Sequence, residues 1–187
     1  TDPANPKVVS DSAELKVPVL ANVKYKAISE PKGDTPYKVE HYFQNIADND
    51  YPATPSETYS KLGSKGEDKT ETPLTYQGFK AGSPSSITQT IAADGSTVFK
   101  FYYERETYNV TLHANPNITS VSNGQYSDPI TMTIPVKYEA PVTISATTAP
   151  GYSFDSWSVD EAGLSPIDNG STWTISYVTD NIDLWAN

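Results

Sequence analysis

Cysteine is absent from this 187-residue chain, so no disulfide bond and no thiolate metal site can stabilise its fold. Small secreted domains commonly depend on disulfides, and a chain without them suits a bacterial surface protein better than an animal secreted one. Apolar residues are also scarce, at 36% of the chain, whereas tyrosine is frequent, with 13 copies. This composition predicts thin cores built from aromatic and β-branched side chains.

Long apolar runs are missing as well. No stretch approaches the length that a membrane-spanning helix needs, so we expect no membrane span in this segment. The first residues, TDPANPKVV, lack the basic and apolar regions of a signal peptide. We therefore expect the chain to be a piece of a longer protein.

Basic side chains are few and unevenly placed. The net charge is −10, of which residues 1–36 contribute nothing, residues 37–107 contribute −3 and residues 108–187 contribute −7. Lys137 is the only base of the last segment. Because such a field repels phosphate backbones, we expect no nucleic-acid partner. We interpret the acidic surface as one that keeps an extracellular protein soluble; the alternative is a surface that binds cations.

Alternating patterns bounded by turn residues predict a mainly β fold. In VFKFYY (residues 98–103) successive side chains point to opposite faces of a strand, and the preceding Asp94-Gly95 pair is a turn signal. A similar run covers residues 37–46, with Tyr37, Val39 and His41 on one face, and four or more follow Tyr108, separated by Asn-Gly and Pro-Gly pairs. No long amphipathic helix is evident, and residues 159–164 could form one helical turn at most.

Two changes of pattern divide the chain into three parts. A Pro- and Gly-containing connection lies at SEPKGDTPY (residues 29–37), and both pattern and charge change near Thr107. We predict an N-terminal segment of residues 1–36, a first unit of residues 37–106 and a second unit of residues 107–187.

The junction between the two units is short. We expect the last strand of the first unit and the first strand of the second to be joined by Glu104, Arg105 and Glu106, with Tyr103 and Tyr108 packing across the junction. One or two connecting residues leave little slack, so the junction is predicted to be semi-rigid.

The N-terminal 36 residues are too few for a domain of their own. VLANVKYKA (residues 19–27) aligns without a gap with VTDNIDLWA (residues 178–186). We interpret this similarity as an internal repeat, which makes residues 1–36 the tail of a preceding repeat, with its own strand. Chance similarity over nine residues is the alternative.

Residues 108–187 resemble the internalin-type B repeat, also called the Listeria–Bacteroides repeat, of bacterial surface proteins. That family has a Tyr-x-Val-x-Phe opening, a Gly-Tyr-x-Phe-x-Gly-Trp centre and an Ile-x-Leu-x-Ala close. The matching residues are Tyr108, Val110 and Leu112 in the opening, Gly151, Tyr152, Phe154 and Trp157 in the centre, and Ile182, Leu184 and Ala186 in the close. We expect the central aromatic residues to pack in the core, with Tyr152 and Phe154 on one strand face and Trp157 turning in at the end of the strand. This copy departs from the pattern where HANPN replaces a glycine pair and where Ser156 stands at a glycine position.

The first unit resembles a second type of repeat. YKVEHYFQNI, YQGF and TIAADGSTVFKFYYER are similar to the mucin-binding-protein type of repeat, which often precedes the B repeat. Together the two resemblances imply small β-grasp-like modules in tandem, on secreted or wall-attached adhesins, and they imply no catalytic residue.

No constellation of residues points to an enzyme. The only two histidines, His41 and His113, fall in different units at strand positions, where we expect structural roles. Asp160 and Glu161 are adjacent, so on a strand their carboxylates face opposite ways and cannot share one cleft.

Binding residues are few. Tyr51, Tyr76 and Tyr126 lie next to Pro, Gly or Asn in expected loops, so they are the rings least committed to a core and the candidate ligand contacts. Asp48 and Asp50 form a weak calcium candidate, because the glycine and the bidentate glutamate of an EF-hand loop are missing. We expect no other cofactor.

Two functions fit these observations. The first, which we favour, is a non-catalytic stalk or spacer that projects a binding domain of an adhesin from the bacterial surface or cell wall, each module stabilised by neighbouring repeats. The alternative is a module that itself binds a host glycan or a mucin-type glycoprotein, through stacking on exposed aromatic rings or pairing at an edge strand.

Overall fold

Strands and loops make up the whole part of the chain that the structure describes. The computed structural model describes residues 33–187, which lie in one compact unit and contain fifteen strands and no helix. Within these residues, no helix is long and apolar enough to cross a membrane. The expected repeat copy at residues 19–27 lies outside the described residues. So do residues 1–32 of the expected N-terminal tail (residues 1–36).

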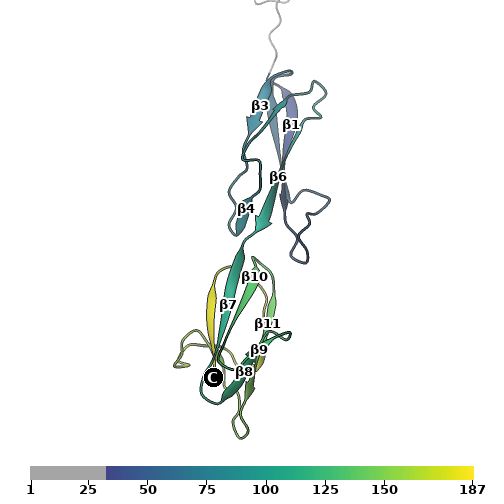
Figure 1. Ribbon diagram of the computed structural model, residues 1–187. Coiled ribbons are helices and arrows are strands. Elements are labelled where there is room, and N and C mark those ends of the chain that lie inside the picture. Colours follow the sequence, from purple (N-terminus) through teal and green to yellow (C-terminus); the bar gives the residue numbers. More distant parts are fainter. Residues whose placement is uncertain (1–32) are drawn as a thin grey trace, which may run out of the picture. The chain divides into compact units, whose positions relative to one another are not determined.

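The first module, formed by strands β1 to β6, has a four-stranded sheet in the order β2-β1-β6-β4 and a two-stranded sheet, β3-β5 (Figure 1). Its two central strands, β1 and β6, run parallel, with Val39 opposite Phe99. The strands are β1 (Thr35–Phe43), β2 (Glu57–Gly63), β3 (Asp68–Glu71), β4 (Phe79–Ala81), β5 (Ile87–Thr90) and β6 (Val98–Arg105).

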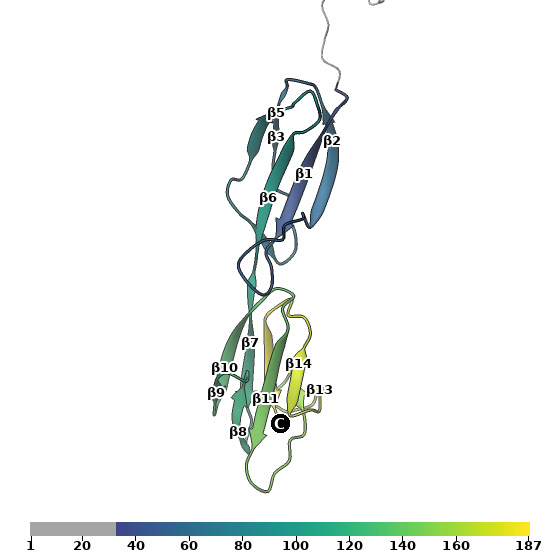
Figure 2. The ribbon, with the colours of Figure 1, turned by 90° about the vertical axis from the view of Figure 1, so that its right-hand side faces the viewer.

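The second module, formed by strands β7 to β15, has a five-stranded sheet in the order β10-β7-β15-β12-β13 and a four-stranded sheet in the order β14-β11-β8-β9 (Figure 2). Here too the first and last strands, β7 and β15, are parallel neighbours. The strands are β7 (Thr107–Ala114), β8 (Ile118–Ser122), β9 (Ser127–Asp128), β10 (Thr131–Lys137), β11 (Val142–Thr148), β12 (Trp157–Ser158), β13 (Pro166–Asp168), β14 (Thr172–Ile175) and β15 (Ile182–Ala186).

The larger sheets of the two modules share one arrangement. In each module the first strand pairs in parallel with the last and antiparallel with a strand on its other side, which is β2 in the first module and β10 in the second. Every strand pair within residues 33–187 joins strands of the same module. The prediction of a β-rich chain of tandem small modules is confirmed, whereas the β-grasp-like classification stays a prediction.

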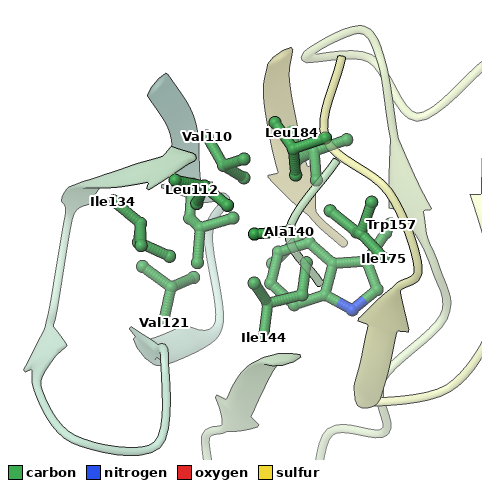
Figure 3. Packing of buried hydrophobic residues seen from close by; sticks show 12 residues of the cluster. Val110, Leu112, Val121, Ile134, Ala140, Ile144, Trp157, Ile175 and Leu184 are labelled. Carbon is green, nitrogen blue, oxygen red and sulfur yellow. The ribbon is translucent and has the colours of Figure 1, made fainter. Parts of the chain in front are cut away.

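The core of the second module lies between its two sheets and is apolar. Val110 and Leu112 of β7, Leu184 of β15 and Ile144 of β11 are fully buried around Trp157 (Figure 3). The indole N–H of Trp157 donates to the carbonyl of Gly170 at 3.1 Å, so the one polar atom of the ring is satisfied. Sheet-on-sheet packing of alternating residues accounts for this core.

Part of the aromatic motif GYSFDSW behaves differently from the prediction. Trp157 is buried and Phe154 packs against the core, as expected of core residues. Tyr152, expected on the same strand face as Phe154, is instead 58% exposed, because residues 152–156 form no strand and the chain turns at Gly151, whose φ is +86°. Residues 159–164 form turns rather than a helical turn.

The core of the first module is aromatic. Tyr37, Phe99, Phe101 and Tyr103 are buried, and alternation along β1 and β6 places them on one face of the sheet. Ile91 and, from the two-stranded β3-β5 sheet, Ile87 pack against this face. His41 of β1 is buried on the same face, so a polar side chain enters this core.

Candidate functional site at the seam between the modules

Glu106 alone separates β6, which ends at Arg105, from β7, which begins at Thr107 (Figure 1). Both backbone groups of Glu106 are hydrogen-bonded: its N–H donates to the carbonyl of Gly78 at 2.9 Å, and its carbonyl accepts the N–H of Tyr138 at 2.8 Å. Glu106 is thus hydrogen-bonded to Gly78 of the first module and to Tyr138 of the second. This is the geometry of a clamped connection rather than of a free linker.

Arg105 joins the two modules through its guanidinium group. Its Nε donates to the carbonyl of Gln44 in the first module at 2.7 Å. Its Nη1 donates to the carbonyl of Tyr138 at 2.9 Å and to Oε2 of Glu139 at 2.8 Å, both in the second module. The side chain of Arg105 is only 12% exposed, so these charge-assisted bonds are largely shielded from water.

Aromatic packing surrounds this arginine. The ring of Phe79 lies 4.8 Å from the guanidinium carbon of Arg105 and meets the ring of Tyr138 edge-on, with centroids 5.5 Å apart. Tyr138 is 9% exposed and lies directly over Gly78. The seam therefore combines an apolar contact, a cation–π contact and hydrogen bonds in one place.

The expected packing of Tyr103 and Tyr108 across the junction is wrong. Tyr103 is fully buried in the core of the first module, because it continues the inward-facing series of β6. Tyr108 contacts Tyr138 within the second module, with ring centroids 6.2 Å apart. The rings that meet across the seam come instead from Phe79 of β4 and from Tyr138, which directly follows β10.

Lys137, the only base of residues 108–187, also contacts the first module. Its Nζ donates to the carbonyls of Asn45 at 3.4 Å and Ile46 at 3.5 Å, and to that of Asp48. These carbonyls belong to the loop that follows β1. The single positive charge of the second module is thus placed against exposed backbone oxygens of the first.

The same loop contains the calcium candidates, Asp48 and Asp50. Oδ1 of Asp48 accepts the side-chain amide of Asn45 and the N–H of Asp50, each at 2.9 Å. These hydrogen bonds, with a smaller contribution from Lys137, hold the pKa of the Asp48 carboxyl below its usual value. No group of three or more potential metal-ligating side chains occurs among residues 33–187. The carboxylate of Asp48 organises the turn that Lys137 contacts.

The three candidate tyrosines do not come together. Tyr51 packs edge-on against Tyr102 at 5.0 Å, and Tyr126, at 64% exposure, lies in the second module. Tyr76, expected to be free of the core, contacts Phe43 and Tyr103 with centroids 4.7 and 5.0 Å apart. Of the three, only Tyr126 is the exposed ring that the sequence suggested.

His41 and the groups around it form a second polar feature, which the sequence did not indicate. His41 is 1% exposed in β1, and its Nδ1 lies 2.7 Å from the hydroxyl of Tyr103. Burial lowers the pKa of His41, so its neutral form is favoured. Its Nε2 has no hydrogen-bond partner.

Two carboxylates near His41 are held by phenols. Glu57 accepts the hydroxyls of Tyr59 and Tyr76, each at 2.8 Å. Glu71 accepts the hydroxyl of Tyr37 at 2.6 Å and pairs with Lys61 at 2.6 Å. Burial and the bond to Glu71 raise the pKa of Tyr37 to about 12. A cavity of about 210 Å³ lies beside this network, lined by Val39, His41, Tyr59, Lys61, Glu71, Thr72 and Leu74.

Comparison with known proteins finds a family match for the second module. Residues 108–187 match the family described as the divergent InlB B-repeat domain, and these 80 residues are less than half of the chain. The resemblance drawn from Tyr108, Trp157 and Leu184 is confirmed for this segment. Domains of this family are non-catalytic structural repeats typical of bacterial surface proteins.

No curated protein matches the chain. Among solved structures, the chain is similar to the Bacillus anthracis TIE protein, with a TM-score of 0.38 and 10% sequence identity. The matched region covers 81% of this chain and 34% of that one, so the chain spans about a third of the length of its structural relative.

Proposed function

We propose that this chain is a stalk segment of a bacterial cell-surface adhesin, which projects a binding domain outward from the cell surface or cell wall. The match of residues 108–187 to a structural surface repeat supports this proposal. Its partners in this role are neighbouring repeats of the same chain, and its location is extracellular.

The observation that carries the proposal is the clamped seam. A spacer keeps a binding domain far from the cell surface only if successive modules keep their mutual orientation. A flexible joint lets the chain fold back, which shortens its end-to-end distance. Here a single connecting residue, the Arg105 bridge and the contact of Phe79 with Tyr138 all restrict that orientation. Tandem repeats that interact only with their neighbours gain stability in this way.

Distance measurement between two spin labels tests this proposal. Because the chain has no cysteine, Ser60→Cys on β2 and Thr133→Cys on β10 place one label on an exposed position of each module. We expect a single narrow distance distribution between the labels in the full chain. A broad distribution, as given by freely pivoting modules, would contradict the stalk proposal.

Arg105→Ala is the informative variant in the same experiment. Removing the guanidinium breaks three hydrogen bonds at the seam while leaving both cores intact, so the distribution should broaden markedly. The matched control is Glu104→Ala, because Glu104 is the exposed neighbour on the same strand. An unchanged distribution in Arg105→Ala would place the rigidity elsewhere.

Recognition of a host glycan or mucin-type glycoprotein is the second candidate function. The observation that favours it is the cavity of the first module, whose mainly apolar lining carries the polar groups of His41, Lys61 and Glu71. The full chain should be tested against mucins, matrix proteins and a glycan panel, with and without calcium. Saturable binding would support the recognition function. Absence of binding by a folded, monodisperse sample would support the stalk function instead.

A further inference from the structure

The two modules allow a residue-by-residue comparison of one sheet face. Tyr37 and Val39 of β1 correspond to Tyr108 and Val110 of β7, since each pair forms the same Tyr-x-Val sequence at the same place in the parallel strand pair. On this register His41 corresponds to Leu112: His41 pairs with Phe101 across the sheet, and Leu112 pairs with Leu184. The first module thus has a buried histidine where the second has a buried leucine.

The neighbouring strand shows the same substitution of polar for apolar residues. In the second module, Met132, Ile134 and Val136 of β10 pair with β7 and pack in the core. The corresponding residues of β2 in the first module are Glu57, Tyr59 and Lys61. A face that is dry and covered by a second sheet in one module is therefore polar and borders a cavity in the other.

His41 supplies an unsatisfied donor at this face. The hydroxyl oxygen of Tyr103 already accepts the N–H of Leu74 at 3.0 Å, so the hydroxyl proton is left to donate to Nδ1 of His41. In that arrangement the imidazole hydrogen is on Nε2. If the hydrogen were on Nδ1 instead, both the hydroxyl proton of Tyr103 and Nε2 of His41 would lack a partner, whereas the first arrangement leaves only Nε2–H unpaired. Nε2–H is thus a buried donor without an acceptor, which native structures rarely leave unexplained.

The charges around the cavity exclude an anionic occupant. Glu57 and Glu71 contribute two negative charges and Lys61 one positive charge, while burial keeps His41 neutral. Both carboxylate oxygens of Glu71 are occupied, one by the hydroxyl of Tyr37 and the other by Lys61, whereas Lys61 retains two N–H groups beyond its bond to Glu71. The cavity therefore offers donors in a field that is negative overall, which suits a neutral molecule that carries hydroxyl or carbonyl oxygens.

The size and shape of the cavity restrict the class of ligand further. A volume of about 210 Å³ lies below the usual range of roughly 300–1,000 Å³ for drug-sized ligands, so one small ring fits but no larger ligand does. Tyr59 contributes a half-exposed aromatic ring to the lining, with its centroid 5.5 Å from that of His41. An aromatic ring beside hydrogen-bond donors is suited to the alternating C–H faces and hydroxyl edges of a sugar.

We propose that this cavity binds one neutral sugar residue of a glycan, with a ring face on Tyr59 and hydroxyl oxygens accepting from Lys61 Nζ and His41 Nε2. The inference rests on the second candidate function and names the site at which it operates. Nε2 is closed off from solvent, so the proposal requires neighbouring side chains to move before a sugar hydroxyl reaches it; the ring of Tyr59, with its centroid 5.5 Å from that of His41, is one such neighbour. A single sugar makes few contacts, so its dissociation constant is on the order of millimolar.

Titration of the full chain with simple sugars tests the site. The probes are the methyl glycosides of galactose and N-acetylglucosamine, with sialic acid as the anionic comparison, and the readout is the NMR signals of the His41 imidazole. We expect at least one neutral glycoside to shift these signals saturably and sialic acid to leave them in place. Saturable shifts with sialic acid alone would overturn the charge argument and the proposal.

Two variants and their controls assign the binding to this cavity. His41→Leu, which introduces the residue of the second module, and Lys61→Met, which keeps the side-chain stem, should each weaken binding at least tenfold. Because His41→Leu removes the imidazole, the NMR signals of the Tyr59 ring are the readout for the variants and their controls. Their controls, His113→Leu and Lys69→Met, should stay within twofold of the unaltered chain, since neither residue lines the cavity. Lys61 is a half-exposed residue, so its variant keeps the test valid even where His41→Leu disturbs the core.

The outcomes distinguish failure of the proposed cavity site from failure of the glycan-recognition function. Glycan binding by the full chain that persists unchanged in both variants would support recognition and reject the cavity as its site. Absence of binding to every sugar and to the wider glycan panel would reject both. Loss of binding in both variants, with intact controls, would support both.

Discussion

The ring of Tyr138 lies against the backbone of Gly78, so closely that a Cβ atom on Gly78 would stand 2.2 Å from Cγ of the ring. Gly78 also has a φ of +72°, which residues with a side chain rarely adopt. Two separate requirements thus demand glycine at this position of the seam.

Gly78→Ala should therefore be far more damaging than an ordinary glycine substitution. Backbone conformation costs about 1–2 kcal/mol, and forcing Tyr138 away from the seam adds roughly 1–3 kcal/mol. Gly66→Ala is the matched control, because Gly66 has a φ of +78° and a Cβ atom added there would meet no atom within 4 Å. Chemical denaturation of both variants measures the difference, and equal losses would show that the contact with Tyr138 contributes nothing.

Lys137→Met should loosen the loop that follows β1. The substitution removes the donor to the carbonyls of Asn45, Ile46 and Asp48, and hydrogen bonds from charged groups contribute about 1.5–3 kcal/mol when shielded, less when exposed as here. Hydrogen exchange at the amide of Asn45, which donates to the carbonyl of Asp50, reports the loop. We expect faster exchange there than in Lys80→Met, a control at an exposed position of β4.

Trp157→Phe should destabilise the second module by about 2–3 kcal/mol, through lost packing volume and an unpaired carbonyl on Gly170. Trp185→Phe is the control, since Trp185 is only partly buried and stacks on His113 outside the core, with centroids 4.6 Å apart. The three tryptophans of the chain all belong to the second module, so their fluorescence follows its unfolding. A similar loss in both variants would mean that Trp157 has no special place in the core.

Acidification should destabilise the first module through His41. Its pKa is lowered in the folded state from 6.5, so below about pH 6.5 the unfolded chain binds a proton that the folded chain does not. The contribution is complete above this pH and decreases as the pH falls toward the folded-state pKa, with a slope of at most about 1.4 kcal/mol per pH unit. Unfolding curves between pH 7 and pH 5 measure it. The slope should be smaller in His41→Leu, and an equal slope there would assign the effect to other groups.

Local patterns predicted much of this fold. Alternation placed Tyr37, Val39 and His41 on one face of β1, and all three are buried there. The Gly-Tyr-x-Phe-x-x-Trp motif likewise indicated Trp157 as a core residue, which it is. The first of these features depends on neighbours along one strand, which is the information that a periodic sequence contains, whereas the second rests on the family motif.

The seam was predicted in position but not in composition. Arg105 and Glu106 were expected there, but the contact of Phe79 with Tyr138 brings together residues 59 positions apart, one in β4 and the other in the turn after β10. No periodicity links them. Tyr76 was misjudged for the same reason: its neighbours Phe43 and Tyr103 come from β1 and β6, so its burial follows from the assembled sheet and not from its loop-like flanks.

The parallel pairing of the first and last strands affects how each module responds to tension. A force applied through Thr107 at the start of β7 and Ala186 at the end of β15 pulls the two neighbours in opposite directions along their length. The ladder between them is then loaded in shear, so its hydrogen bonds share the load instead of opening one at a time from an end. The β1–β6 pair is also parallel, so in each module the central strand pair resists extension by shear.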